Sequence, residues 1–312
     1  MDIVLNVALT LAGLTMLCFG GNWLVGGGVS IAKRYRVSSL IIGMTIVAYG
    51  TSTPELAASI AAAGEHGAII LGNVVGSNIA NVGMVIGISA VLVPLAAGAS
   101  ILRREILIMI GVSFLLVALS ADGELSMYDG LALLGGLGVF AVHTFRIAMN
   151  NRDHTITDEK PRSMSASIAL IIIGVVLLYA GAILTVENAV ILAQELGLSE
   201  KLIGLTVIAI GTSLPELITS IIAIKKGHTD IGIGNIIGSN IYNILMILGL
   251  GAALGGVTTG ADVYVDYTIM IIFSLSLLIV VKTKVIGRKM GVCLAAGYAA
   301  YLAVFLFYTG SA

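Results

Sequence analysis

Long apolar stretches alternate with short polar ones along the whole chain, and this pattern predicts helices rather than strands. Most stretches approach or exceed the roughly 20 apolar residues that an α-helix needs to cross a hydrocarbon core. The predicted helices cover residues 3–31, 38–63, 68–98, 105–121, 127–149, 165–194, 202–224, 230–258, 266–281 and 290–309. The sequence therefore predicts an all-α polytopic membrane protein with ten transmembrane helices.

The basic residues indicate how these helices are oriented. Fifteen of the 16 lysines and arginines fall in or beside the loops after the first, third, fifth, seventh and ninth helices, and Lys201 is the exception. Acidic residues gather in the alternate loops. Because Lys and Arg concentrate on the cytoplasmic side, both termini are expected outside and the protein in the cytoplasmic membrane.

Composition narrows the class further. Apolar residues make up 58% of the chain and charged residues 11%, and the mean hydropathy is +1.08, which excludes a large soluble domain. The net charge of −1 and the dispersed basic residues exclude nucleic acid as a partner. Cys18 and Cys293 lie far apart in apolar stretches and are expected as small packing residues rather than a disulfide or metal site.

The chain contains a duplicated segment. Residues 43–60, GMTIVAYGTSTPELAASI, match residues 204–221, GLTVIAIGTSLPELITSI, at eleven of eighteen positions. A second pair, GNVVGSNIANVG from Gly72 and GNIIGSNIYNIL from Gly234, has nearly the same offset. The whole half is therefore predicted to be duplicated.

The copies lie five helices apart, and an odd number of crossings reverses direction. The halves are therefore predicted as two inverted five-helix repeats, residues 1–149 and 165–312, with repeat motifs at 43–83 and 204–245 and a cytoplasmic linker at 150–164. Inverted repeats with interrupted helices are typical of secondary transporters whose site lies at the bilayer midplane.

Glu55 and Glu216 occupy equivalent positions in the two copies. Apart from Glu187, they are expected to be the only carboxylates deep inside apolar helices, where an ionised group costs about 2.5–3.5 kcal/mol. The second, third, seventh and eighth helices contain no Lys or Arg. A bound cation is the simplest source of the missing positive charge, and two protonated glutamates are the alternative.

Proline and hydroxyl residues surround each glutamate. Pro54 and Pro215 are expected to break their helices and free carbonyl groups near Ala48 and Thr51 and near Ala209 and Thr212. Helical spacing places Ser52 and Ser59 on the face of Glu55, and Ser213 and Ser220 on that of Glu216. Partner helices add Ser77, Asn81, Ser239 and Asn243.

These ligands are all oxygens. Hard cations, Ca²⁺ above all, prefer such sites, whereas zinc or copper requires His or Cys. The four histidines, including His143, are expected at solvated helix ends or loops. The glycines of GNVVGSN and GNIIGSN are expected to pack the third helix on the second and the eighth on the seventh, rather than to hold a phosphate.

The doubled GTSTPE and GTSLPE motifs, each followed by GN-x-x-GSN, resemble the two alpha-repeats of the sodium/calcium exchanger family within the calcium/cation antiporters. The resemblance covers nearly the whole chain. It implies that Glu55 and Glu216 coordinate Ca²⁺ together with backbone oxygens of Thr51 and Thr212. It also implies that Asn81 and Asn243 surround a central water or ion. The sodium ligands that it implies are Ser52, Ser213, Ser77, Ser239, Ala48 and Ala209.

Asn243 departs from relatives that carry Asp there, which argues against potassium coupling, and the Thr-Ser of each motif favours sodium over protons. The expected function is Na⁺/Ca²⁺ antiport by alternating access, with the first and sixth helices rocking on a rigid core, as the resemblance implies. The alternatives are an H⁺/Ca²⁺ or other cation exchanger, an intramembrane hydrolase and a passive cation channel. No enzyme activity, cofactor or obligatory protein partner is expected beyond the bilayer and the transported Ca²⁺ and Na⁺.

Overall fold

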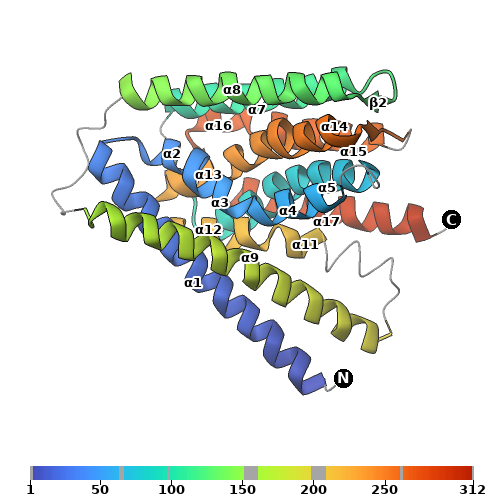
Figure 1. The fold of residues 1–312 in the computed structure, drawn as a ribbon, viewed down its shortest axis with the longest axis horizontal. Coiled ribbons are helices and arrows are strands. Elements are labelled where there is room, and N and C mark those ends of the chain that lie inside the picture. The colour runs from blue at the N-terminus through green and yellow to red at the C-terminus, as the bar shows by residue number, and fades with distance from the viewer. Residues whose placement is uncertain are drawn as a thin grey trace.

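A computed structural model describes residues 3–62, 67–96, 99–150, 161–197, 209–260 and 263–310 (Figure 1). Lys201, most of the predicted linker 150–164 and residues 204–208 of the second repeat motif lie outside these described residues. Within them, each of the ten predicted ranges is mainly helical, although several are built from two or more consecutive helices, and the ranges 68–98 and 230–258 each contain a short strand near the end. The structure is thus an all-α membrane fold, and the number of helices that cross the bilayer stays a prediction.

The first half opens with a single long helix and then becomes segmented. Its elements are α1 (Ile3–Tyr35), α2 (Ser39–Ile42), the π-helix η1 (Gly43–Val47), α3 (Ala48–Thr51), α4 (Thr53–Ala62), α5 (Gly67–Ala80), the π-helix η2 (Asn81–Ile86), α6 (Gly87–Leu92), β1 (Leu95–Ala96), α7 (Ala99–Leu119), β2 (Glu124–Leu125) and α8 (Met127–Asn150).

The second half follows the same order. Its described elements are α9 (Met164–Glu195), α11 (Ala209–Thr212), α12 (Leu214–Lys225), α13 (Thr229–Tyr242), the π-helix η4 (Asn243–Leu248), α14 (Gly249–Gly255), β3 (Val257–Thr258), α15 (Val263–Ser276), α16 (Leu278–Thr283), β4 (Val285–Ile286) and α17 (Arg288–Gly310).

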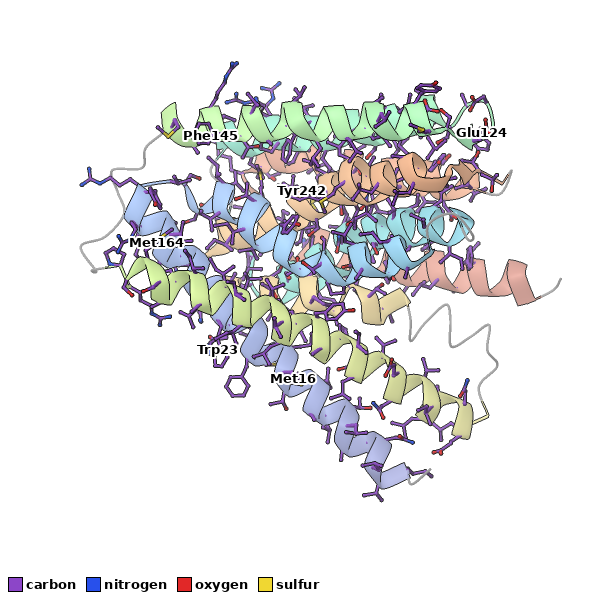
Figure 2. All side chains as sticks on the ribbon, in the orientation of Figure 1. Met16, Trp23, Glu124, Phe145, Met164 and Tyr242 are labelled. Atoms are coloured by element: carbon purple, nitrogen blue, oxygen red, sulfur yellow. The ribbon has the colours of Figure 1, made fainter. Side chains whose placement is uncertain are left out.

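The helices form a bundle with the repeat motifs at its centre. In Figure 1, α1 and α9 lie side by side along the lower edge and α8 along the upper edge, with α13, α5 and α14 between them. Figure 2 labels Phe145 on α8 and Tyr242 near the middle of the view; Tyr242 is half-buried, and its ring lies 6.1 Å from those of both Tyr49 and Phe140. Large apolar side chains such as Phe145, 66% exposed, cover the outside, as a surface in contact with lipid requires.

Two short antiparallel ladders, which the sequence analysis missed, join the halves. Leu95 of β1 pairs with Ile286 of β4, and Glu124 of β2 pairs with Thr258 of β3. The first ladder connects the loops after the predicted third and ninth helices, and the second connects the loops after the fourth and eighth. Each pair of loops was predicted to share a side of the membrane, and the ladders agree with that arrangement.

Glycines bring α13 against the second helix of the other half. A Cβ atom built on Gly234 would lie 2.5 Å from the carbonyl oxygen of Leu40, and one built on Gly238 would lie 2.5 Å from that of Met44. The prediction that these glycines pack the eighth helix on the seventh is therefore wrong. Repeat symmetry identifies equivalent glycines, but it does not say which half supplies the neighbour.

Two expectations about charged residues also need correction. Glu105 of α7 is fully buried, with neither carboxylate oxygen hydrogen-bonded, whereas Glu187 is exposed. Glu105 lies 3.5 Å from Nε2 of His143, which is half-buried within α8 rather than solvated. Glu105 was not predicted to be buried because it follows Arg103 and Arg104 in sequence, which suggested a loop.

Cys18 and Cys293 are exposed free thiols, so they form no disulfide and do not fill the interior as expected.

Candidate cation site

Both copies of the GTS-x-PE motif interrupt a helix. Ser52 separates α3 from α4 with φ −82° and ψ 6°, and Ser213 separates α11 from α12 with φ −91° and ψ 4°. Pro54 and Pro215 lie in the first turn after each break, where a missing amide hydrogen is tolerated. The breaks confirm the prediction that the two motifs interrupt their helices.

Each break places a glutamate in the first turn of a new helix. Glu55 lies at the start of α4 and Glu216 at the start of α12. Helix N-termini carry a partial positive charge that favours carboxylates, typically by about 0.3–1 kcal/mol at exposed sites. The interrupted helices therefore provide a modest part of the compensation that the two acids need.

The two glutamates are buried inside the protein and do not face lipid. Glu55 is 2% and Glu216 1% exposed, and the two carboxyl groups are close enough to interact electrostatically. Oε2 of each has no hydrogen-bond partner, and neither glutamate forms a salt bridge within the described part of the chain. Two neighbouring acids are thus buried with no basic side chain among the described residues to neutralise them.

Hydroxyl groups link the two halves around Glu216. The Ser52 hydroxyl lies 3.3 Å from Oε1 of Glu216 and donates to Oγ of Ser239 at 3.1 Å, and Thr51 Oγ1 lies 3.5 Å from the same Ser239 oxygen. All three contacts cross from one repeat to the other. The structure therefore brings Thr51, Ser52, Ser239 and Glu216 together, as the repeat predicted.

The remaining predicted residues are arranged less uniformly. Ser77, Asn81 and Asn243 are buried, as are Ser59 and Ser220. Ser213 is fully buried with no partner for its hydroxyl, whereas Thr212 is only partly buried. Ala209 begins α11. The buried positions of the serines agree with the predicted inward faces of α4 and α12.

One predicted feature of Ala48 is wrong. Its carbonyl oxygen is not freed by the helix break, because it accepts hydrogen bonds from the amide of Ser52 at 3.0 Å and from the hydroxyl of Thr51 at 3.2 Å. The proline is two residues beyond Ser52, so the donor that it removes is the one that would serve Gly50, four residues before Pro54.

Three asparagines close to these groups were missed. Asn235 accepts from the Thr51 hydroxyl at 3.0 Å and donates to Oγ of Ser220 at 3.0 Å. Asn78 and Asn240 hydrogen-bond to Asn243 and Asn81 respectively. All three belong to the repeated GN-x-x-GSN segments, of which the sequence analysis selected only the glycines and the serines Ser77 and Ser239.

Helix geometry changes at equivalent points in both repeats. The π-helices η2 and η4 begin at Asn81 and Asn243. Such π-turns inside α-helices are frequent at functional sites. Buried oxygens without a partner gather on these elements and on the interrupted helices: Glu55 Oε2, Glu216 Oε2, Asn81 Oδ1, Asn243 Oδ1, Ser59 Oγ and Ser213 Oγ. Carboxylate, amide and hydroxyl oxygens are the ligands of hard cations.

Comparison with known proteins gives a consistent result. The sequence pattern of the family described as "Sodium/calcium exchanger protein" matches residues 5–146 and again residues 166–307, one copy in each half. Inner membrane protein YrbG of Escherichia coli K12 is 36% identical, over 96% of this chain and 97% of its own. Sodium/calcium exchanger MaX1 of Methanosarcina acetivorans is 35% identical, over 98% and 99%.

Solved structures of the sodium-calcium exchanger NCX_Mj share the fold. One, soaked with 10 mM Na⁺ and zero Ca²⁺, superposes with a TM-score of 0.83 at 33% identity and covers 97% of this chain and 99% of that one. Another, soaked with neither ion, gives a TM-score of 0.84 at 34% identity. Both family matches, the relatives and the fold agree, and the chain is a membrane transporter that belongs to the sodium/calcium exchanger family.

Proposed function

We propose that this protein is a secondary active antiporter that exchanges Na⁺ for Ca²⁺ across the cytoplasmic membrane by alternating access, with both termini outside. The observation that carries the proposal is the pair of buried carboxylates, one from each repeat, which have no basic partner in the part of the chain that the structure describes. The names of MaX1 and NCX_Mj, both called sodium/calcium exchangers, support the choice of ions.

The proposed site divides its ligands by ion. Ca²⁺ binds between Glu55 and Glu216, assisted by backbone oxygens of Thr51 and Thr212. Na⁺ ions bind around it, and Asn81 and Asn243 face a central water or ion; the proposed sodium ligands are Ser52, Ser213, Ser77, Ser239, Ala48 and Ala209. The cross-repeat contacts of Ser52 support this arrangement, because they bring a sodium ligand beside a calcium ligand.

Exchange follows from charge. Two bare carboxylates cannot pass through a low-dielectric intermediate without a penalty of several kcal/mol, whereas one Ca²⁺ or several Na⁺ offset their charge. The empty site therefore switches slowly and the occupied site switches readily. This coupling requires no gate other than the ions themselves.

The moving part in this proposal is the pair α1 and α9. A Cβ built on Gly20 would lie 2.8 Å from the carbonyl oxygen of Gly174, and one on Gly181 would lie 2.8 Å from that of Gly13. Near the other end, the hydroxyls of Ser30 and Ser167 hydrogen-bond at 2.9 Å. Contacts at both ends support movement of α1 and α9 as one unit across the core.

The test is transport by the purified protein in liposomes. Vesicles loaded with Na⁺ and diluted into choline medium should accumulate ⁴⁵Ca²⁺, whereas vesicles without a Na⁺ gradient should not. Uptake driven by a pH gradient alone would instead favour the H⁺/Ca²⁺ exchanger. Ca²⁺ entry that needs no counter-ion would favour a channel. No second function is favoured by a particular contact in the structure.

A further inference from the structure

Four asparagines form a crosswise network at the centre of the bundle. Asn78 and Asn81 come from α5 and η2, and Asn240 and Asn243 come from α13 and η4. Each is 1% exposed. We call Asn78 and Asn240 the inner pair and Asn81 and Asn243 the outer pair. Members of each pair occupy equivalent positions of the two repeats.

The inner pair is fixed by reciprocal bonds to the opposite main chain. Nδ2 of Asn78 donates to the carbonyl oxygen of Asn240 at 3.2 Å, and Nδ2 of Asn240 donates to that of Asn78 at 3.3 Å. The same nitrogens lie 3.8 Å and 3.7 Å from the sulfurs of Met270 and Met109, which are again equivalent positions. With each amide nitrogen held this way, each inner Oδ1 must point in the other direction.

The outer pair is held by those inner oxygens. Asn81 donates through Nδ2 to Oδ1 of Asn240, and Asn243 donates through Nδ2 to Oδ1 of Asn78, both at 3.0 Å. Both outer Oδ1 atoms are buried and have no hydrogen-bond partner among the residues that the structure describes. All four side-chain amides therefore donate toward the opposite repeat, and the Oδ1 atoms of Asn81 and Asn243 remain available as acceptors.

The open oxygens belong to the helix segments that line the proposed site. Asn243 lies four residues after Ser239, whose hydroxyl contacts Ser52 beside Glu216. Asn81 bears the same relation to Ser77. A buried amide oxygen without a partner is unfavourable, so a cation at this position would stabilise it.

Resting on the proposed function, we propose that Asn78 and Asn240 are positioning residues that act crosswise: Asn78 turns the side-chain oxygen of Asn243 toward the cation, and Asn240 turns that of Asn81. An asparagine side chain has nearly the same shape with its oxygen and nitrogen exchanged. Without the inner pair, the outer amides would turn NH₂ toward the ion for part of the time, and an N–H donor repels a cation. The inner residues thus set cation affinity without touching the ion.

A crosswise pattern of coupling tests this proposal. Purified wild type and variants are compared by equilibrium dialysis with ⁴⁵Ca²⁺ and by displacement with Na⁺. N78L should weaken Ca²⁺ binding about tenfold, equivalent to the loss of about 1.4 kcal/mol. The same substitution should weaken it again in an N81A background but have no further effect in an N243A background. N240L should show the reverse, with its effect absent in N81A and present in N243A.

The opposite pattern overturns the inference. A purely structural role predicts that N78L costs the same in both backgrounds, and an unchanged affinity in N78L alone also contradicts the proposal. Should N78L fail to fold, N78D keeps an acceptor for Asn243 but loses the donor to Asn240. The cost of N243A should then be the same in N78D as in wild type, and a vanished cost would overturn the crosswise role.

Failure of the two proposals can be told apart. Wild type that binds Ca²⁺ but shows no Na⁺-driven uptake removes the exchange function and leaves the coupling measurements to decide the role of the inner pair. Wild type that exchanges, combined with equal costs in both backgrounds, removes only the positioning role. Wild type that binds neither Ca²⁺ nor Na⁺ removes both.

Discussion

Two pairs of helical segments, all apolar enough to cross a membrane, have opposite surroundings. In the segments Ile69–Leu92 and Thr229–Gly255, 83% of the most apolar stretch is buried, against 22% in α1 and 28% in α9. The buried pair interacts through hydrogen bonds between asparagines of the two repeats, whereas α1 and α9 interact through glycine backbones. Hydropathy therefore identifies membrane helices, but the polar residues show which of them form the buried centre of the bundle.

The largest effect should come from removing the charge at that centre. E55Q and E216Q should each lower Na⁺-driven Ca²⁺ uptake at least about 100-fold, equivalent to about 2.7 kcal/mol, because each removes one of the two carboxylates proposed to hold the ion. E105Q is the matched control, as Glu105 is equally buried but contacts His143 of α8 rather than the site. Uptake is measured in liposomes with each variant at equal density.

E105Q should keep wild-type uptake. Equal losses in all three variants would mean that any buried acid supports folding, and the glutamate pair would lose its special role. Normal uptake by E55Q would contradict the proposed site directly.

Disulfides would test whether α1 and α9 move across the core as one unit. In a background lacking Cys18 and Cys293, G28C with I42C would tie α1 to α2, since a Cβ on Gly28 lies 3.0 Å from a methyl of Ile42. Oxidation should reduce uptake more than about tenfold, and a reductant should restore it. S30C with S167C would tie α1 to α9, where the hydroxyls are already 2.9 Å apart, and should leave uptake unchanged.

The second pair of cysteines is the control for cross-linking itself. Arrest by the bond between α1 and α9 would show that these helices slide on each other, which contradicts movement as one unit. Undiminished uptake with α1 tied to α2 would show that α1 does not move across the core.

The smallest effect concerns packing. G238V should lower the stability of the detergent-solubilised protein by about 1–3 kcal/mol, because the added Cβ would meet the carbonyl of Met44. G138A on the exposed surface of α8, where no described atom lies within 4 Å of the added methyl, should be neutral or stabilising by up to about 1 kcal/mol. Thermal unfolding measures both, and equal stability of the two variants would contradict the close approach of α13 to η1.

The sequence was sufficient for the repeat, the helix breaks and the burial of both glutamates, because duplication repeats each signal. It was not sufficient for contacts between halves. Asn78 bonds to Asn240 and Gly238 packs on Met44, although the motif alone suggested neighbours within one repeat. The contact between Glu105 and His143 was not predicted, because a charged residue near a helix end has the same sequence pattern whether it is solvated or packed on another helix.

The two β ladders have a consequence for biogenesis. Each takes one strand from each half, so the first half leaves the ribosome with Leu95 and Glu124 facing no complementary strand. Their main-chain amides and carbonyls stay open to water or to chaperones until the second half inserts. Both ladders can therefore form only after the second half of the polypeptide has been made and inserted.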